Sequence, residues 1–267
     1  MSICVSDIYN ELINYAPLEY ALDFDNPGHL VGDLHQPVER VLIALDATSA
    51  VIDEAVKNDA QLIISHHPLI FNKLGSVVCD DTVGNRVIRL IKSNISLICM
   101  HTNLDAAEGG VNDVLAEKIG LGNLSVLDVL GTCGNREYGI GRVGELSQAE
   151  STTAFLKRVK SALNAPGLRY TASGKKIKKV AVGGGSCGSY LEKVCSLGCD
   201  AFVTADVKHD VFLAARERGI TLVDAGHFST ENPVCSAIEK RLNERFPALD
   251  VRVAKSNREP EEFYLGE

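Results

Sequence analysis

Short apolar runs alternate with amphipathic stretches along most of the chain, and this alternation predicts an α/β fold. Residues 41–66 read VLIALDATSAVIDEAVKNDAQLIISH: an apolar run, a turn of small residues, an amphipathic stretch and a second apolar run. Residues 180–205 read VAVGGGSCGSYLEKVCSLGCDAFVTA and align with the first stretch without a gap. A strand, a helix and a second strand in this order favour parallel pairing of the two strands. We therefore expect two related α/β lobes with mixed sheets, although a chance similarity between two βαβ units gives the same pattern.

A second pair of segments places polar residues just after apolar runs. SLICMHTNLD ends a strand-like run at His101, and Asp105 follows four residues later. TLVDAGHFSTE ends a similar run at His227, and Glu231 follows four residues later. A helical pattern comes next in both places, so each acidic residue lies between the carboxyl end of a strand and a helix. Ligands of open α/β sheets bind at that edge.

The same patterns indicate the lobe boundary and several helix ends. We expect lobes at 1–126 and 127–267, with an amphipathic stretch near 149–164 in the second. Ser6 or Asp7 is suited to cap a helix near the N-terminus. Asn232 and Pro233 mark the start of another helix, as an N-cap residue and the first helical residue.

Composition narrows the class of protein. The 267 residues are 45% hydrophobic and carry a formal net charge of −8. This apolar content excludes a disordered chain, and the negative charge opposes non-specific binding to nucleic acid. No stretch approaches the ~20 apolar residues of a membrane helix, and the N-terminus lacks the pattern of a signal peptide. The eight cysteines show no CxxC spacing, so we expect reduced, structural thiols in a cytoplasmic protein.

Two adjacent histidines end the apolar run QLIISHHPLIF. Pro68 disfavours a helical conformation at His67, and the side chains of consecutive extended residues diverge. His66 and His67 would then serve two different ions better than one. A polar turn that closes a strand is the alternative interpretation of this pair.

The remaining polar residues favour a metal site. Four imidazoles and two carboxylates suit Zn, Fe, Mn or Co, and a carboxylate can bridge two ions. Two ions ~3.5–4 Å apart can clamp the attacking and leaving groups of a hydrolysis. We therefore expect one dinuclear site between the lobes, built from His66, His67, His101, Asp105, His227 and Glu231.

Several motifs together resemble a known family. They are FDNPGHLVGD, ISHHPLIF, HTNLDAAEGGVNDVLAEKIGL, VAVGGGSCG, TADVKHD and DAGHFSTE, and they cover nearly the whole chain. This set resembles the GTP cyclohydrolase I type 2 family, also known as the NGG1-interacting-factor-like family of dinuclear-metal proteins. Phe24 stands where that family usually has Trp.

The resemblance implies a site and an activity. It implies that two divalent cations, Zn, Fe or Mn, are bound by His66, His67, Asp105, His227 and Glu231, with Glu231 bridging. His101 lies beside them, and we expect it either to support these ligands or to carry protons. The implied reaction converts GTP to 7,8-dihydroneopterin triphosphate and formate. The implied assembly is a toroidal homohexamer whose metal sites face an internal cavity, and the short middle segment indicates the compact form without an inserted domain.

Other functions stay open at this point. The chain suits another dinuclear metal-dependent hydrolase of a nucleotide or metabolite, or a non-catalytic metal-binding or scaffold protein. GGGSCG also satisfies the dinucleotide pattern GxGxxG, but the equivalent turn DATSAV lacks the glycines, which favours a tight turn or a loop that approaches a phosphate. The resemblance implies that TADVKHD lies in the cavity wall, where its polar residues would orient substrate, and a helix cap with a solvated helix start is the alternative interpretation.

Overall fold

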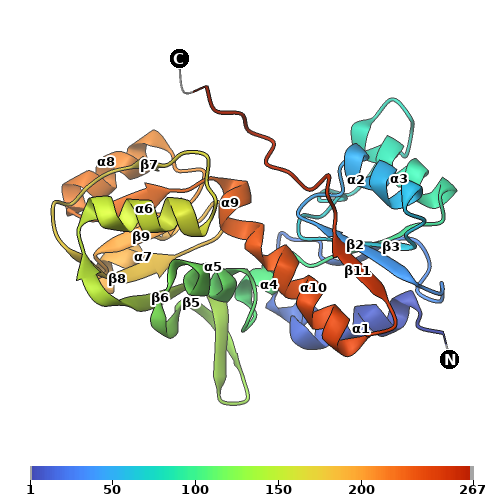
Figure 1. Ribbon diagram of the computed structural model, residues 1–267, viewed down its shortest axis with the longest axis horizontal. Coiled ribbons are helices and arrows are strands. Elements are labelled where there is room, and N and C mark those ends of the chain that lie inside the picture. Colours follow the sequence, from blue (N-terminus) through green and yellow to red (C-terminus); the bar gives the residue numbers. More distant parts are fainter. Residues whose placement is uncertain (1, 265–267) are drawn as a thin grey trace. The chain divides into compact units, whose positions relative to one another are not determined.

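Two separate β-sheets organise the chain (Figure 1). The computed structural model describes residues 2–264 as a mixed α/β protein. It divides into a first unit, which spans residues up to 107 and 235–258, and a second unit, which spans 108–234 and the residues from 259 on. This division differs from the expected lobes 1–126 and 127–267. A helix after residue 110 packs on the second sheet, and a strand near the C-terminus returns to the first.

The first unit contains a five-stranded sheet of order β1-β4-β3-β2-β11. The last four of these strands run parallel, and β1 pairs antiparallel with β4. Its strands are β1 (Gly28–Val31), β2 (Arg40–Ala44), β3 (Leu62–Ser65), β4 (Ser96–Cys99) and β11 (Asp250–Val253). Its helices are α1 (Val5–Tyr15), η1 (Leu18–Tyr20), α2 (Ser49–Lys57), α3 (Thr82–Lys92), α4 (Thr102–Ala106) and most of α10 (Pro233–Arg245).

The second unit contains a six-stranded sheet of order β5-β6-β8-β9-β10-β7. Its β8, β9 and β10 run parallel, whereas β5, β6 and the edge strand β7 pair antiparallel with their neighbours. Its strands are β5 (Gly122–Cys133), β6 (Arg136–Glu150), β7 (Arg169–Tyr170), β8 (Ile177–Val182), β9 (Ala201–Thr204) and β10 (Thr221–Asp224). Its helices are α5 (Val111–Ile119), α6 (Thr152–Ala162), η2 (Gly188–Tyr190), α7 (Leu191–Ser196), α8 (His209–Arg218) and α9 (His227–Glu231).

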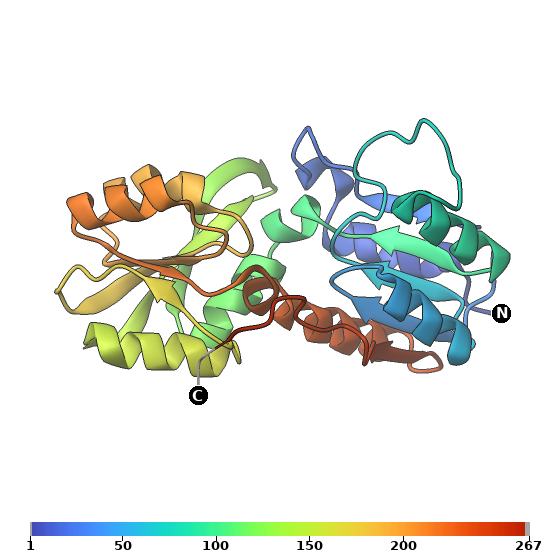
Figure 2. The same cartoon turned by 90° about the horizontal axis from the view of Figure 1, so that it is seen from above.

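Helices cover both faces of each sheet, which explains the continuous apolar strands. In the first unit, α2 and α3 lie on one face and α1 and α10 on the other (Figure 1). In the second unit, α6 and α8 lie on opposite faces (Figure 2). Parallel strands that are covered on both sides read as unbroken apolar runs, and every residue of β3, β4, β9 and β10 is buried.

The predicted βαβ pairs and helix starts can now be compared with the structure. The two aligned stretches form β2-α2-β3 and β8-α7-β9, with parallel pairing in each, as predicted. Pro233 begins α10, also as predicted. The expected cap at Ser6 or Asp7 is wrong, because Cys4 is the N-cap residue and Asp7 accepts a hydrogen bond from its backbone N at 2.8 Å. Among the helices of residues 2–264, none has the length and apolar character needed to cross a bilayer.

Candidate metal centre

Three histidines of the first unit gather where two parallel strands end. His66 and His67 follow β3, and His101 lies just before α4, two residues after β4. Ser65 pairs with Cys99 in the register of these strands, so both strands end at the same edge. The ring centroids are 4.9 Å apart for His66 and His67, 5.2 Å for His66 and His101, and 5.6 Å for His67 and His101. One ligand nitrogen of each ring lies within 4.8 Å of the others.

The rings of His66 and His67 do not diverge as expected from an extended chain. Both residues lie in a bend beyond the end of β3, so the alternation of a strand no longer applies to them. Asp105 belongs to the same cluster, since its Oδ1 is 3.6 Å from Nε2 of the buried His66. The first unit therefore brings together three imidazoles and one carboxylate.

Each of these histidines is held through Nδ1. His66 Nδ1 lies 2.8 Å from the carbonyl oxygen of Met100, and His67 Nδ1 lies 3.1 Å from Asp46 Oδ1. His101 Nδ1 lies 2.7 Å from Asp25 Oδ1. An acceptor at Nδ1 favours the tautomer that carries its proton there and leaves Nε2 as the electron-pair donor. Metal-binding histidines are oriented in this way.

Asp25 forms hydrogen bonds both with His101 and with Thr102, the first residue of α4. Its Oδ2 accepts from the backbone N of Thr102 at 2.9 Å and from the hydroxyl of the same residue at 2.5 Å. Burial raises the pKa of Asp25, but the hydrogen bonds from His101 and Thr102 outweigh it and lower the pKa to about 2. The carboxylate is thus ionised at neutral pH and holds the Nδ1 proton of His101.

The second unit repeats this arrangement with one histidine. His227 and Glu231 are one turn apart on α9, and Nε2 of His227 lies 3.0 Å from Glu231 Oε2. His227 Nδ1 lies 2.6 Å from Asp206 Oδ2. Glu231 is buried, and Gly185 leaves the space beside it, because an added Cβ would lie 2.1 Å from Glu231 Oε1. The Glu231 carboxylate thus occupies space that a side chain at position 185 would fill.

The sequence did not single out Asp25 and Asp46 as partners of histidines. Asp206 belongs to TADVKHD, which was expected to orient substrate or to begin a solvated helix, and its carboxylate contacts His227. Asp46 and Asp206 each follow a parallel strand closely, and each precedes its histidine by 21 residues. That repeated spacing was available in the sequence as a signal. Asp25 lies 76 residues before His101, and no local pattern indicates their contact.

The glycine-rich loop GGGSCG is a turn whose amides serve the protein itself. The backbone N of Gly184 donates to Asn112 Oδ1 at 2.9 Å, and that of Gly185 donates to Thr230 Oγ1 at 3.0 Å. These bonds tie the loop after β8 to α5 and α9. The arrangement favours the tight-turn interpretation over a dinucleotide or phosphate loop.

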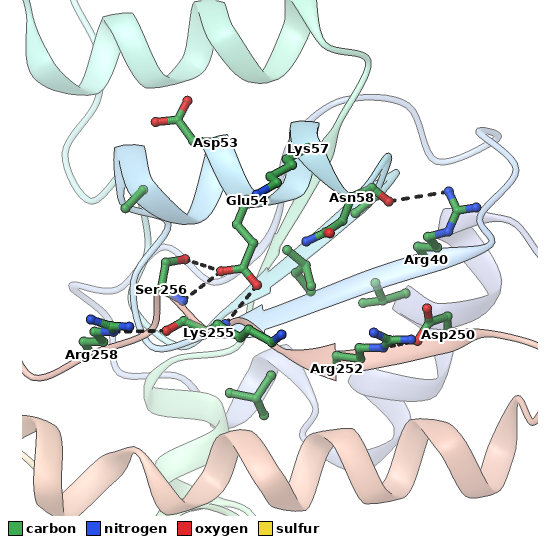
Figure 3. Close-up of a pocket in the computed structure, with 15 residues that line it drawn as sticks. Arg40, Asp53, Glu54, Lys57, Asn58, Asp250, Arg252, Lys255, Ser256 and Arg258 are labelled. Carbon is green, nitrogen blue, oxygen red and sulfur yellow. Dashed lines mark hydrogen bonds and ion pairs between the residues drawn. The ribbon is translucent and has the colours of Figure 1, made fainter.

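A cavity of about 700 Å³ lies elsewhere in the first unit, beside α2 and the segment 250–258 (Figure 3). Glu54 accepts hydrogen bonds from Lys255 N at 2.9 Å, Ser256 N at 2.8 Å and Ser256 Oγ at 2.6 Å. Burial raises the pKa of Glu54, but these hydrogen bonds outweigh it and lower the pKa. The lining residues do not include the histidines of the candidate metal centre.

Comparison with known proteins gives consistent matches over nearly the whole chain. Residues 3–262 match the family described as Duf34/NIF3 (NGG1p interacting factor 3). A GTP cyclohydrolase 1 type 2 homolog of Clostridium perfringens is 35% identical over 97% of this chain and 99% of its own. The homolog of the same name from Clostridium acetobutylicum is 34% identical over 98% and 100%. The crystal structure of a Bacillus cereus protein related to NIF3 has a TM-score of 0.92 at 26% identity, covering 98% of this chain and 99% of that one.

Proposed function

Because the chain belongs to the Duf34/NIF3 family, we propose that it is a divalent-metal-dependent hydrolase that acts on a nucleotide, with GTP as the first candidate. The observation that carries this proposal is the common geometry of four histidines. In His66, His67, His101 and His227, an oxygen acceptor lies at Nδ1, which favours the tautomer whose Nε2 can bind a metal ion, and Nε2 of His227 lies 3.0 Å from Glu231 Oε2.

The proposed metal ligands come from both units. They are His66, His67, Asp105, His227 and Glu231, and the donor set of imidazoles and carboxylates suits two ions of Zn, Fe or Mn. Glu231 is the proposed bridging carboxylate. The expectation that one pair of ions uses ligands from both units stays a prediction, and the metal content of variants in each unit tests it.

His101 is the proposed proton carrier. When bound, the divalent cations would lower the pKa of a water molecule and supply hydroxide at neutral pH. Asp25 holds the Nδ1 proton of His101. Nε2 of His101 can therefore accept a proton from water and return it to the leaving nitrogen of the substrate. A ring nitrogen of His101 lies within 4.8 Å of a ring nitrogen of His66 and of His67, so His101 can support the metal site as well.

The proposed reaction follows the names of the relatives. One water adds at C8 of the guanine ring of GTP and the five-membered ring opens, and a second water releases C8 as formate. The ribose carbons then rearrange and close onto the freed amine with loss of one water, which gives 7,8-dihydroneopterin triphosphate. Both Clostridium relatives are named as homologs of GTP cyclohydrolase 1 type 2, which supports this substrate for a first assay.

The test is GTP turnover by protein reconstituted with Zn, Mn or Fe, followed through fluorescence of the oxidised pterin product. We expect product only with metal present, and we expect Glu231→Gln to lose turnover while it stays folded. Glu244→Gln is a matched control, since this exposed residue pairs only loosely with Lys240, at 3.9 Å. Absence of product from protein that holds two ions per chain would refute the GTP reaction and leave another hydrolysis or metal handling to be assayed.

A toroidal homohexamer and a cytoplasmic location are also proposed for this protein. Light scattering of the purified chain at several concentrations measures the assembly directly. A mass of six chains supports the proposal, and a stable monomer or dimer contradicts it.

A further inference from the structure

Two exposed phenylalanines lie beside the histidines of the first unit. The centroids of the Phe24 and Phe71 rings are 6.2 Å apart, and the Phe71 ring lies 6.4 Å from that of His101. Phe24 is 64% exposed and Phe71 is 44% exposed. Single exposed apolar residues are ordinary, but a pair of aromatic rings in contact beside a polar cluster indicates a surface that binds something.

The rings are exposed, yet the backbone on which they stand is anchored. Asp25, next to Phe24, bonds to both His101 and Thr102. The side-chain amide of Asn26 donates to the carbonyl oxygen of Ile70, the residue before Phe71, at 2.5 Å. The two phenylalanines are therefore fixed relative to His101 and to each other by hydrogen bonds of their neighbours.

The chemistry of this surface suits a flat ring. Neither phenylalanine offers a hydrogen bond, and an aromatic face stacks well on the π-face of a nucleobase. The ring planes of Phe24 and Phe71 are inclined by 50°, so a planar ligand would stack on one phenylalanine and meet the other obliquely. His101 stands next to that position with the nitrogen that is available for proton transfer.

We propose that Phe24 and Phe71 form a binding subsite for the planar heteroaromatic ring of the substrate, a purine base, beside His101. This proposal rests on the proposed hydrolysis of a nucleotide, whose reacting carbon belongs to the base. The subsite positions the ring, and its two phenylalanines take no part in proton transfer.

The absence of tryptophan from the sequence makes the subsite directly measurable. Phe24→Trp places a single indole in the subsite, and its fluorescence is titrated with guanosine and, separately, with ribose 5-phosphate. We expect saturable quenching by guanosine alone, with and without bound metal. Adding Phe71→Ala should weaken guanosine binding at least about fivefold, which is the lower end of the effect of removing one stacking partner.

Matched variants separate stacking from apolar area and from folding. Phe71→Leu keeps apolar bulk without an aromatic face and should not restore binding, whereas Phe71→Tyr should. Phe263→Ala, at an exposed phenylalanine of the second unit, should leave guanosine binding unchanged. The metal content of every variant is measured by elemental analysis and should not change.

The outcomes distinguish this proposal from the proposed function. Quenching by guanosine without turnover of GTP supports the subsite and refutes the reaction. Turnover of GTP with an unchanged KM in Phe71→Ala overturns the subsite and leaves the reaction standing. Equal quenching by ribose 5-phosphate also overturns it. So does a changed oligomeric state of Phe71→Ala with unchanged guanosine affinity, because the rings would then belong to a subunit interface.

Discussion

At the scale of single residues, Gly185 shows how the backbone makes room for a ligand set. Its φ is +60°, and an added Cβ would lie 2.1 Å from Glu231 Oε1 and 3.2 Å from His227 Nε2. We expect Gly185→Ala to displace the Glu231 carboxylate and lower the bound metal at least several-fold, while the far-ultraviolet circular dichroism stays native. Elemental analysis after dialysis against limiting metal measures the loss.

A second glycine provides the control for backbone strain. Gly174 has a φ of +75°, and a Cβ added there meets no atom within 4 Å. Gly174→Ala therefore carries a similar cost of a left-handed backbone, about 1 kcal/mol, without the clash. Equal loss of metal in both variants would contradict the importance of the space beside Glu231.

We expect the ionised carboxylate of Asp25 to contribute to the stability of the first unit. Its side chain is fully buried and accepts hydrogen bonds from Thr102 and from His101. Asp25→Asn places an amide donor among these donors, so we expect a loss of about 1–3 kcal/mol in the free energy of unfolding at pH 7. Urea denaturation measures it, and the exposed neighbour Asp23 provides the control variant Asp23→Asn.

The pKa of Asp25 also fixes the direction of the pH dependence. The folded-state pKa of about 2 lies below the ordinary value of 3.8, so the unfolded chain takes up the proton first as the pH falls. The stabilisation is complete above about pH 4 and is lost as the pH falls toward 2. The difference in unfolding free energy between wild type and Asp25→Asn should therefore shrink over that range, and a constant difference would contradict this assignment.

At the scale of elements, a buried ion pair joins α5 to β6. Arg142 Nε donates to Asp113 Oδ1 at 2.7 Å, and a second guanidinium nitrogen donates to Oδ2 at 3.0 Å. Arg142→Met leaves the Asp113 carboxylate without this partner in a buried place, so we expect a loss of about 3–5 kcal/mol in the free energy of unfolding. The exposed pair of Arg218 and Glu192 is the comparison, and Arg218→Ala should cost at most about 1 kcal/mol.

Denaturant unfolding of both arginine variants tests whether the pair of Arg142 and Asp113 contributes more to the free energy of unfolding because it is buried. A similar small cost for Arg142→Met and Arg218→Ala would contradict that explanation. The relation between α5 and β6 also bears on the site, because Asn112 of α5 accepts from the amide of Gly184 beside Glu231.

The elements themselves were largely predictable from the sequence. Short apolar runs lie in β2, β3, β8 and β9, since parallel strands covered on both faces need an apolar sequence. The candidate residues His66, His67 and His101 were found because each ends such a run. What the pattern could not supply was the geometry beyond the strand ends, where His66 and His67 turn their rings into one cluster.

At the scale of the whole molecule, the two units of the structure differ from the expected lobes for a physical reason. Each expected lobe was one continuous stretch of sequence. In the structure, β11 near the C-terminus pairs with β2 of the first unit. The run DVRV that forms β11 is short and half polar, so nothing local marks it as part of a distant sheet. The contact between Asp25 and His101 escaped prediction in the same way, because it depends on tertiary folding.

The returning segment is also where the first unit should be most sensitive to loss of chain. β11 pairs with four residues of β2, Asn257 accepts from Leu45 N at 3.0 Å, and Glu54 accepts from Lys255 and Ser256. Truncation after Leu249 removes all of these contacts. It leaves β2 paired only with β3, as the new edge strand of the sheet. We expect hydrogen exchange to show loss of protection in β2 and retention in β8, since the second sheet receives no strand from this segment. Equal loss of protection in β2 and β8 would mean that the two units unfold as one, and unchanged protection in β2 would mean that the first sheet does not need its last strand.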